Sequence, residues 1–478
     1  MPVIFINGEA VDTGEHPTVL QAALANGFYV PHFCWHPELS VVGNCRVCLV
    51  EQEGRGVNIA CNMPVVDGMR IETDSETVRA QRKAMLQFIL LNHPVDCGIC
   101  DKAGECTLQD YHYAYNGEPA LSREPKLKGT KFYPLSSRIL LDNERCILCS
   151  RCVRFTREVS KSNVLGIEYR GDSALVRPAE DRTLDDDPYS DNVIDICPVG
   201  ALLSRSFLHQ ARVWYLEPTP SVCPRCARGC TVQLWHRKPE WQLKTLDPSQ
   251  NTRILRVTPL ENPRVNGPWI CNRGRDLGEV LERPRAEQAL QKGAGVTMME
   301  AIEATRALIA ESTRRIALVS SWASNEELRA FQNALGDRFT SFVKPDQLPE
   351  EGEVVEDELL IRADKNPNTR AAQDLFGSEA PEIREDADLI LVWGEGVDFA
   401  QLPRGAKIVF LGSWLLPEVG HADVFIPLSI QTERRGHYTN FEGVVSAFEP
   451  CQPRPEGVID AETLFPLLAA PGGARGRA

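Results

Sequence analysis

Fifteen of the sixteen cysteines in this sequence, together with one histidine, fall into four groups whose spacing could bind metal. The first group has ten, two and twelve residues between its members, which are Cys34, Cys45, Cys48 and Cys61. A two-iron cluster takes four thiolates, and a loop followed by a close pair of cysteines can surround so small a cluster. Gly43 provides backbone freedom in that loop. The alternative is a set of structural cysteines.

The second group combines one histidine with three cysteines in the pattern H-x3-C-x2-C-x5-C. Its members are His93, Cys97, Cys100 and Cys106. Zinc also binds three thiolates and an imidazole, and a lone histidine is often only a hydrogen-bonded surface or core residue. The spacing alone therefore predicts a metal site without deciding which metal it holds.

The third group is half of a ferredoxin pattern. Its members are Cys146, Cys149, Cys152 and Cys197, the last followed by Pro198. Bacterial ferredoxins carry the run C-x2-C-x2-C-x3-C-P, whose fourth cysteine serves a second cluster. Here the fourth place holds Thr156, and the partners that would precede Cys197 are replaced by Asp187, Ser190 and Val193. The sequence therefore predicts one four-iron cluster here instead of two, with zinc as the alternative.

The fourth group has two, three and forty residues between its members, which are Cys223, Cys226, Cys230 and Cys271. Four cysteines at such spacing can hold a four-iron cluster or a structural zinc ion. Cys451 belongs to no group, and we interpret it as a buried or incidental thiol.

Clustered cysteines are metal ligands more often than disulfides in a reducing compartment. The first residues show neither a basic region nor a long apolar stretch before a cleavage site, so we predict no secretory signal. No run approaches the 18 apolar residues of a membrane-spanning helix. The net charge of −14 argues against a nucleic-acid binder, because such proteins normally carry a basic patch.

The elements that position the first group read as a small β-rich domain. Asn7-Gly8 predicts a hairpin between strands at residues 3–6 and 10–11. A helix over residues 18–27 follows, and then the cysteine loop. Further strands are predicted at residues 47–52, 57–60 and 69–72. This order is that of a β-grasp ferredoxin.

The rest of the chain changes character twice. Residues 78–92 predict a helix that His93-Pro94 ends, and residues 117–131 predict a connecting loop. After Cys271, buried-strand runs alternate with a helix, which suggests an α/β domain with a parallel sheet. These strands are predicted at residues 316–320, 389–393 and 408–411, the helix at 325–335, and a disordered tail at 471–478.

The order of the groups resembles one known family. The His93 group is similar to the His-Cys segment of respiratory NADH dehydrogenase, some NAD-linked formate dehydrogenases and iron-only hydrogenases, which binds a four-iron cluster. The Cys223 group resembles the four-iron domain of molybdopterin oxidoreductases, whose last ligand corresponds to Cys271 in the segment Cys271-Asn272-Arg273-Gly274-Arg275. Together, residues 1 to about 280 closely resemble the large iron–sulfur subunit of bacterial respiratory NADH:quinone oxidoreductase (complex I).

This resemblance implies an α+β multidomain chain with one two-iron and three four-iron clusters. The domains expected are a β-grasp two-iron domain, a His-Cys segment, a ferredoxin-like domain, a molybdopterin-oxidoreductase-type four-iron domain and a shortened α/β molybdopterin-oxidoreductase-like domain with a disordered tail. Their boundaries are predicted at residues 1–78, 79–118, 119–215, 216–275 and 276–478.

The last domain departs from the molybdopterin pattern. Residues 325–327, 387–391 and 433–443 look like remnants of molybdopterin oxidoreductase segments. Only 207 residues follow Cys271, however, and no cysteine lies between Cys271 and Cys451 to bind molybdenum. We therefore expect no molybdopterin.

The resemblance implies electron relay within complex I and no catalytic residue in this chain. Electrons would leave NADH through a flavin (FMN) on a partner subunit and enter at the Cys34 group. They would then pass to the Cys146 group, the His93 group, a two-cluster ferredoxin-like subunit and finally quinone, with the whole complex translocating protons. The Cys223 group would lie off that path. The expected place is the peripheral arm on the cytoplasmic face of the plasma membrane. Alternatives are a formate dehydrogenase or hydrogenase subunit, and a zinc-bound structural protein.

Overall fold

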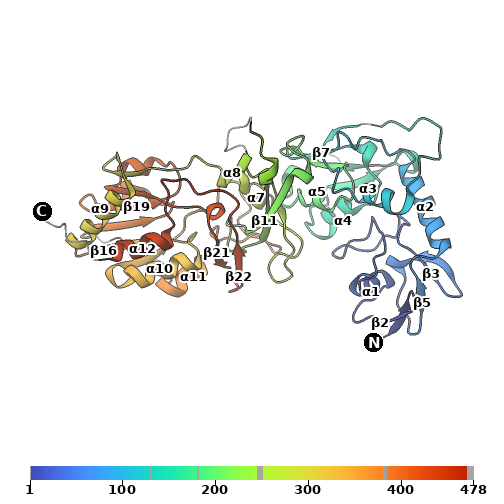
Figure 1. Ribbon diagram of the computed structural model, residues 1–478, viewed down its shortest axis with the longest axis horizontal. Coiled ribbons are helices and arrows are strands. Elements are labelled where there is room, and N and C mark those ends of the chain that lie inside the picture. The colour runs from blue at the N-terminus through green and yellow to red at the C-terminus, as the bar shows by residue number, and fades with distance from the viewer. Residues whose placement is uncertain are drawn as a thin grey trace. The chain divides into compact units, whose positions relative to one another are not determined.

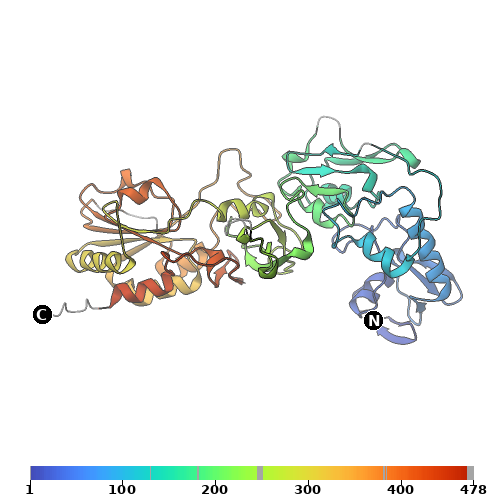
Figure 2. The same ribbon diagram turned by 45° about the horizontal axis from the view of Figure 1, so that its top comes forward.

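The computed structural model describes residues 2–129, 131–179, 182–244, 251–379, 383 and 385–470. It divides into two compact units, Met1–Tyr215 and Leu216–Ala478. Figure 1 labels their elements, and Figure 2 shows the same ribbon from a second direction. Every described helix is too short or too polar to span a lipid bilayer. The tail predicted to be disordered, residues 471–478, lies outside the described residues.

The first unit begins with a five-stranded sheet in the order β2-β1-β5-β3-β4. Its first two strands form the predicted hairpin, in which Asn7 and Gly8 have φ angles of 53° and 86°. Both angles are left-handed, as a two-residue type I′ turn requires. Helix α1 (Val19–Ala25) packs against this sheet and begins at Thr18, whose hydroxyl accepts a hydrogen bond from the Gln21 amide. The strands are β1 (Val3–Ile6), β2 (Glu9–Asp12), β3 (Leu49–Gln52), β4 (Gly56–Ile59) and β5 (Arg70–Glu72).

Helix α2 (Glu76–Leu90) confirms the predicted helix and ends three residues before His93. The remainder of the unit consists of short elements joined by long loops. A three-stranded sheet has the order β10-β7-β6, and β8 pairs with β9. These elements are α3 (Thr107–Tyr111), η2 (His112–Asn116), β6 (Tyr133–Pro134), β7 (Ile139–Leu141), α4 (Arg151–Glu158), β8 (Leu165–Glu168), β9 (Leu175–Pro178), α5 (Asn192–Ile196) and β10 (Leu202–Ser204).

The second unit opens with an antiparallel three-stranded sheet in the order β11-β12-β13. Two short helices, α7 (Asn272–Arg275) and α8 (Leu277–Leu281), follow it. The strands are β11 (Leu216–Val222), β12 (Thr231–Arg237) and β13 (Arg256–Pro259). A separate two-stranded ribbon, β21 (Gly436–Thr439) and β22 (Val445–Phe448), also belongs to this unit.

A seven-stranded sheet forms the larger part of the second unit, in the order β15-β14-β20-β19-β18-β16-β17. Five neighbouring strands run parallel, which confirms the predicted parallel sheet, and β14 and β15 add an antiparallel edge. The strands are β14 (Ala289–Gln291), β15 (Ala294–Val296), β16 (Arg315–Ser320), β17 (Thr340–Lys344), β18 (Leu389–Trp393), β19 (Lys407–Gly412) and β20 (Val424–Pro427).

Apolar residues alternate between the two faces of this sheet, because successive strand side chains point to opposite faces. In β18, Leu389 and Leu391 join one core, whereas Ile390 and Val392 join the other. Four helices contribute to the first core. They are α9 (Met298–Glu311), α10 (Asn325–Leu335), α11 (Thr369–Phe376) and α12 (Ala461–Ala469). Figure 1 shows three of them, α10, α11 and α12, together along one side of the sheet. The chain is therefore a mixed α/β multidomain protein.

Candidate iron–sulfur sites

Two members of the first predicted ligand set, Cys48 and Cys61, belong to the apolar core between α1 and its sheet. Cys34 and Cys45 belong to the irregular loop before β3, Cys48 directly precedes β3, and Cys61 lies in a 3-10 turn after β4. The Cys34 thiol is hydrogen-bonded to Cys45 and Cys61, and Cys48 is hydrogen-bonded to Cys61. The structure thus brings all four predicted ligands together.

These four thiols cannot all ionise at once without a compensating positive charge. Hydrogen bonds from Cys45 and Cys61 lower the pKa of Cys34 to about 2, whereas hydrogen bonds to Cys34 and Cys48, with burial, raise the pKa of Cys61. Backbone amides of Asn44 and Cys45 also donate to the Cys34 sulfur. Ferric or ferrous iron would supply the missing charge, so the residues fit a cluster with four thiolate ligands.

The third set surrounds a cavity of about 20 Å³. Cys146, Cys149, Cys152 and Cys197 all line it, together with apolar side chains that include Leu141, Val176 and Val199. Burial raises the pKa of Cys146 to about 12 and that of Cys149 to about 11, and nearby thiolates add to both effects. Such a site favours neutral thiols unless metal is bound, which is the behaviour expected of a cluster cradle.

The four positions that would hold cysteines of a second ferredoxin cluster are buried. They are Thr156, Asp187, Ser190 and Val193. The Asp187 carboxylate accepts hydrogen bonds of 2.6 Å from the hydroxyls of Ser160 and Ser162. One cluster in this domain stays a prediction.

The second set follows α2. Cys106 lies close enough to Cys100 and Cys97 for their thiolate charges to raise its pKa. Cys97 is exposed at the surface. Cys106 is the N-cap residue of α3. Burial raises the pKa of its thiol, and the nearby amides of Gln109 and Leu108 oppose this shift. The structure therefore gathers the three cysteines of this set.

The charged groups that act on the His93 ring are those of Arg145, Lys126, Asp96 and Lys131, and none of them is a cysteine of its set. His93 therefore remains a predicted ligand. Its Nδ1 atom is buried and has no hydrogen-bond partner in the described part of the chain. Burial, together with the neighbouring cations, lowers the pKa of the ring to about 4. The imidazole is thus neutral at physiological pH with one unsatisfied nitrogen, the state in which histidine binds metal.

The fourth set belongs to the second unit. Cys223, Cys226 and Cys230 lie on the loop between β11 and β12, and Cys271 is the N-cap residue of α7. Burial, reinforced by neighbouring thiolates, raises the pKa of all three of Cys223, Cys230 and Cys271, the last to about 11. Cys451, which belongs to none of the predicted sets, is partly buried.

Across the described residues, no three or more His, Cys, Asp or Glu side chains are arranged to hold a single metal ion. An iron–sulfur cluster differs from such a site because it spreads its ligands over two or four iron atoms. The four sets therefore remain predicted cluster ligands.

Two arginines of α4 join the first set to the third. The buried guanidinium of Arg154 donates to the carbonyls of Cys34 at 2.5 Å and Cys149 at 3.2 Å. Arg151 donates to the carbonyl of Trp35, beside Cys34, and to that of Ile196, beside Cys197. Neither arginine was predicted from the sequence to have a functional role, although both lie within two residues of Cys152.

The third set also adjoins the second. The Thr107 amide, next to Cys106, donates to the carbonyl of Pro198, next to Cys197, at 3.0 Å. Gly200 lies so close to Cys100 that a Cβ atom on it would be 2.2 Å from the Cys100 sulfur. The first unit therefore connects three predicted ligand sets through continuous contacts.

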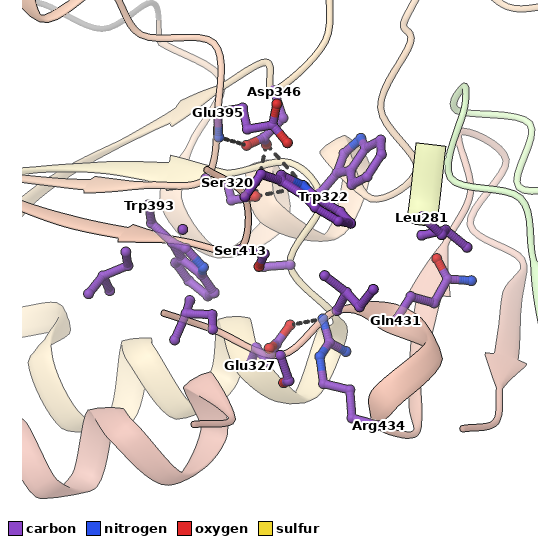
Figure 3. A pocket seen from close by; sticks show the side chains of 18 of the residues that line it. Leu281, Ser320, Trp322, Glu327, Asp346, Trp393, Glu395, Ser413, Gln431 and Arg434 are labelled. Carbon is purple, nitrogen blue, oxygen red and sulfur yellow. Dashed lines mark hydrogen bonds and ion pairs between the residues drawn. The ribbon is translucent and has the colours of Figure 1, made fainter. Parts of the chain in front are cut away.

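A different kind of cavity lies at the carboxyl ends of the parallel strands in the second unit. Its volume is about 70 Å³. Figure 3 shows that Trp322 and Trp393 face it and that the Glu327–Arg434 ion pair, 2.7 Å long, lies at one side. The Asp346 carboxylate is held there by the Ser320 hydroxyl and by Lys344, each at 2.8 Å. The acidic groups of this cavity are thus already paired.

Four family models match consecutive parts of the chain. The 2Fe-2S iron-sulfur cluster binding domain matches residues 3–76, and the NADH-ubiquinone oxidoreductase-G iron-sulfur binding region matches residues 82–118. The ferredoxin-like domain of NADH-quinone oxidoreductase subunit 3 matches residues 136–203, and the molybdopterin oxidoreductase Fe4S4 domain matches residues 216–283. All four predicted ligand sets lie within these ranges.

Curated relatives agree with these matches. The G subunit of NADH-quinone oxidoreductase from Rickettsia bellii is 36% identical over 59% of this chain and 40% of its own length. The NADH-ubiquinone oxidoreductase 75 kDa subunit of Reclinomonas americana is 32% identical over 82% of this chain and 56% of its own length. The chain belongs to this family of NADH-quinone oxidoreductase iron–sulfur subunits.

The curated relatives are longer than this chain, which spans about 40% of the Rickettsia bellii protein. The mitochondrial NADH dehydrogenase (ubiquinone) iron-sulfur protein 1 of Solanum tuberosum is 37% identical over 61% of this chain and 38% of its own length. A solved structure of an NAD+-reducing NiFe-hydrogenase in the H2-reduced state is 32% identical, with a TM-score of 0.41, over 44% of this chain and 91% of that one.

Proposed function

We propose that the chain binds one two-iron and three four-iron clusters. The two-iron cluster would be held in a β-grasp domain, residues 1–78, and the four-iron clusters in domains at 79–118, 119–215 and 216–275. Residues 276–478 would form a degenerate molybdopterin-oxidoreductase-like domain. The proposed ligands are Cys34, Cys45, Cys48 and Cys61; His93, Cys97, Cys100 and Cys106; Cys146, Cys149, Cys152 and Cys197; and Cys223, Cys226, Cys230 and Cys271.

We propose that the chain relays electrons in NADH:quinone oxidoreductase. The observation that carries this proposal is the run of contacts from the first set to the third and from the third to the second. Clusters bound there would supply one-electron transfer, and the protein sets their spacing and potential through ligands, hydrogen bonds and burial. The order of contacts matches the order of transfer expected for this family.

The second set offers a place where electrons could leave the chain. Cys97 is exposed, and its neighbours Val95 and Ile99 are 86% and 60% exposed. Exposed apolar side chains beside a redox ligand suit the approach of a protein partner. We propose a two-cluster ferredoxin-like subunit here, an FMN-containing NADH-oxidising subunit near the first set, and a location in the peripheral arm at the cytoplasmic face of the membrane.

The cavity in Figure 3 supports a domain without molybdopterin. Ligand pockets usually measure about 300–1,000 Å³, whereas this cavity has about 70 Å³ and paired acidic groups. Iron and molybdenum analysis of anaerobically purified protein tests this proposal. Full occupancy predicts about 14 iron atoms per chain and no molybdenum. Stoichiometric molybdenum would favour a catalytic oxidoreductase, and zinc in place of iron would exclude the relay.

The relay itself is tested by removing one ligand at a time. Cys146→Ala should abolish NADH:quinone turnover in the assembled complex, because the third set connects the other two sets of the first unit. Cys223→Ala should leave turnover largely intact if the fourth cluster lies off the path. A Cys146→Ala complex that assembles and retains full turnover would contradict the relay.

A further inference from the structure

Arg154 is among the largest fully buried side chains of the protein, with 1% of its surface exposed. It follows Cys152 by two residues on α4. Its guanidinium donates four hydrogen bonds, and they reach two predicted ligand loops. The acceptors are the carbonyls of Cys34 and Ser40 at 2.5 Å each, the carbonyl of Cys149 at 3.2 Å and the Ser150 hydroxyl at 3.3 Å.

All four acceptors are uncharged, so these hydrogen bonds by themselves do not neutralise the positive charge of Arg154. The nearby Glu158 carboxylate compensates this charge only in part, because it also pairs with the exposed Arg157. Burying a charge is strongly unfavourable unless opposite charge compensates it. The carbonyls that Arg154 binds belong to Cys34 and Cys149, whose thiolates would bind iron in two different clusters. Clusters held by four thiolates carry net negative charge, and those clusters would therefore supply the compensation.

The planar guanidinium also fixes geometry. It presents several N–H donors in one rigid fork, so the carbonyls that it binds are held at a set separation. Other contacts reinforce the same junction. Asn44 donates to the carbonyl of Leu148 at 2.9 Å, and Glu158 accepts from the amide and hydroxyl of Ser40 at 2.8 and 2.7 Å.

We propose that Arg154 is a positioning residue that holds the Cys34 and Cys146 clusters at a fixed separation and makes both easier to reduce. This inference rests on the proposed cluster assignments. Reduction adds a negative charge to a cluster, and a buried positive charge beside it stabilises that state more than an exposed charge would. Arg154 thereby stabilises the reduced state of both the donor and the acceptor cluster of one electron-transfer step.

The test is an EPR-monitored redox titration of the full chain in its complex, with Arg154→Met compared with wild type. Arg157→Met is the matched control, because Arg157 lies on the same helix but is 57% exposed. At the wild-type midpoints, Arg154→Met should reduce the ratio of reduced to oxidised cluster about tenfold for both clusters, a shift of about 59 mV each. The His93 cluster, which Arg154 does not contact, serves as the internal reference.

Arg154→Lys separates charge from geometry. This variant should restore most of the wild-type reduction potential of both clusters, because lysine keeps the positive charge. It should still broaden the distribution of dipolar couplings between the two reduced clusters, because lysine lacks the rigid fork of donors. If Arg154→Met prevents assembly, Arg154→Gln, which keeps donors without the charge, takes its place. Selective loss of the Cys34 and Cys146 clusters in both variants would still support the positioning role.

Two results would overturn the inference. One is an Arg154→Met protein with both clusters at wild-type midpoints, and the other is an equal shift in Arg157→Met or at the His93 cluster. Failure of the proposed function looks different, because wild-type protein would then lack the two-iron or Cys146 EPR signals before any substitution.

Discussion

At the residue scale, Gly200 shows how closely two predicted ligand sets approach each other. It follows Cys197 by three residues, and a Cβ atom on it would lie 2.2 Å from the Cys100 sulfur and 3.2 Å from the Lys102 Cβ. No rotation of a flexible side chain relieves such an overlap without moving the ligand itself. The absence of a side chain at Gly200 therefore allows the loops of these two predicted ligand sets to approach each other closely.

Gly200→Ala should therefore displace Cys100 and reduce occupancy of the second cluster. Overpacking of this kind typically costs about 1–3 kcal/mol. We expect iron content to fall from about 14 towards about 10 atoms per chain, which metal analysis would measure. Gly166→Ala is the control, since a Cβ atom there meets nothing within 4 Å. Unchanged iron in Gly200→Ala would show that the Cys100 loop can move aside.

His93→Cys tests whether the buried imidazole is a ligand. Replacing a neutral imidazole by a thiolate adds negative charge to the cluster and so opposes its reduction. We expect the cluster to be retained with a lower reduction potential, measured by EPR-monitored titration. The Cys223 cluster in the same sample is the reference. A titration identical to that of wild type would argue against ligation by His93.

At the element scale, side-chain hydrogen bonds tie together the starts of neighbouring strands in the parallel sheet. Asp388, directly before β18, accepts hydrogen bonds of 2.9 Å from the Thr313 amide and hydroxyl and from the Arg314 amide. Those two residues directly precede β16, the neighbouring strand. The tie therefore holds the starts of two central strands together.

Asp388→Asn should make the stability of the sheet less dependent on pH. The Thr313 and Arg314 amides lower the pKa of Asp388 below its ordinary value of 3.8. A carboxyl with a lowered folded-state pKa stabilises the fold above that ordinary value and loses this contribution as pH falls through the folded pKa. Because Asp388 is partly exposed to solvent, the effect should be below about 1 kcal/mol.

Urea denaturation followed by tryptophan fluorescence would measure this effect, since Trp393 ends β18. The difference between wild type and Asp388→Asn should be largest near neutral pH and shrink in acid. Asp374→Asn, an exposed acid on α11 paired with Arg370, controls for the loss of a surface charge. A difference that stays constant with pH would show that the tie does not depend on charge.

At the scale of the whole molecule, the two units depend differently on their predicted clusters. Cys48 and Cys61 belong to the apolar core of the first sheet. By contrast, the two cores of the seven-stranded sheet contain no predicted ligand among their described members. Removal of iron should therefore loosen the first unit and leave the α/β sheet folded.

Hydrogen exchange before and after anaerobic removal of iron would test this difference. Amide protection should fall in residues 34–61, 93–106 and 146–152 and remain in β16, β18, β19 and β20. Loss of protection across the whole chain in one step would contradict the expected independence of the sheet.

Local sequence patterns predicted several of the elements and grouped the candidate ligands. Asn7-Gly8, the buried-strand runs and the helix over residues 325–335 all lie where local pattern predicted them, because turn geometry and side-chain periodicity act over a few residues. The spacing of the cysteines likewise encodes which loops can surround a cluster, and the family comparisons agree with that grouping.

The contacts between these groups are visible only in the folded chain. Arg154 reaches a carbonyl 120 residues earlier, Gly200 faces Cys100, and Asp187 binds Ser160 and Ser162. No local pattern predicts such contacts, since they arise from packing between segments that are distant in sequence. The spacing of the cysteines therefore predicts which residues act as ligands, whereas the approach of the three predicted sets within the first unit depends on the buried contacts that join their loops.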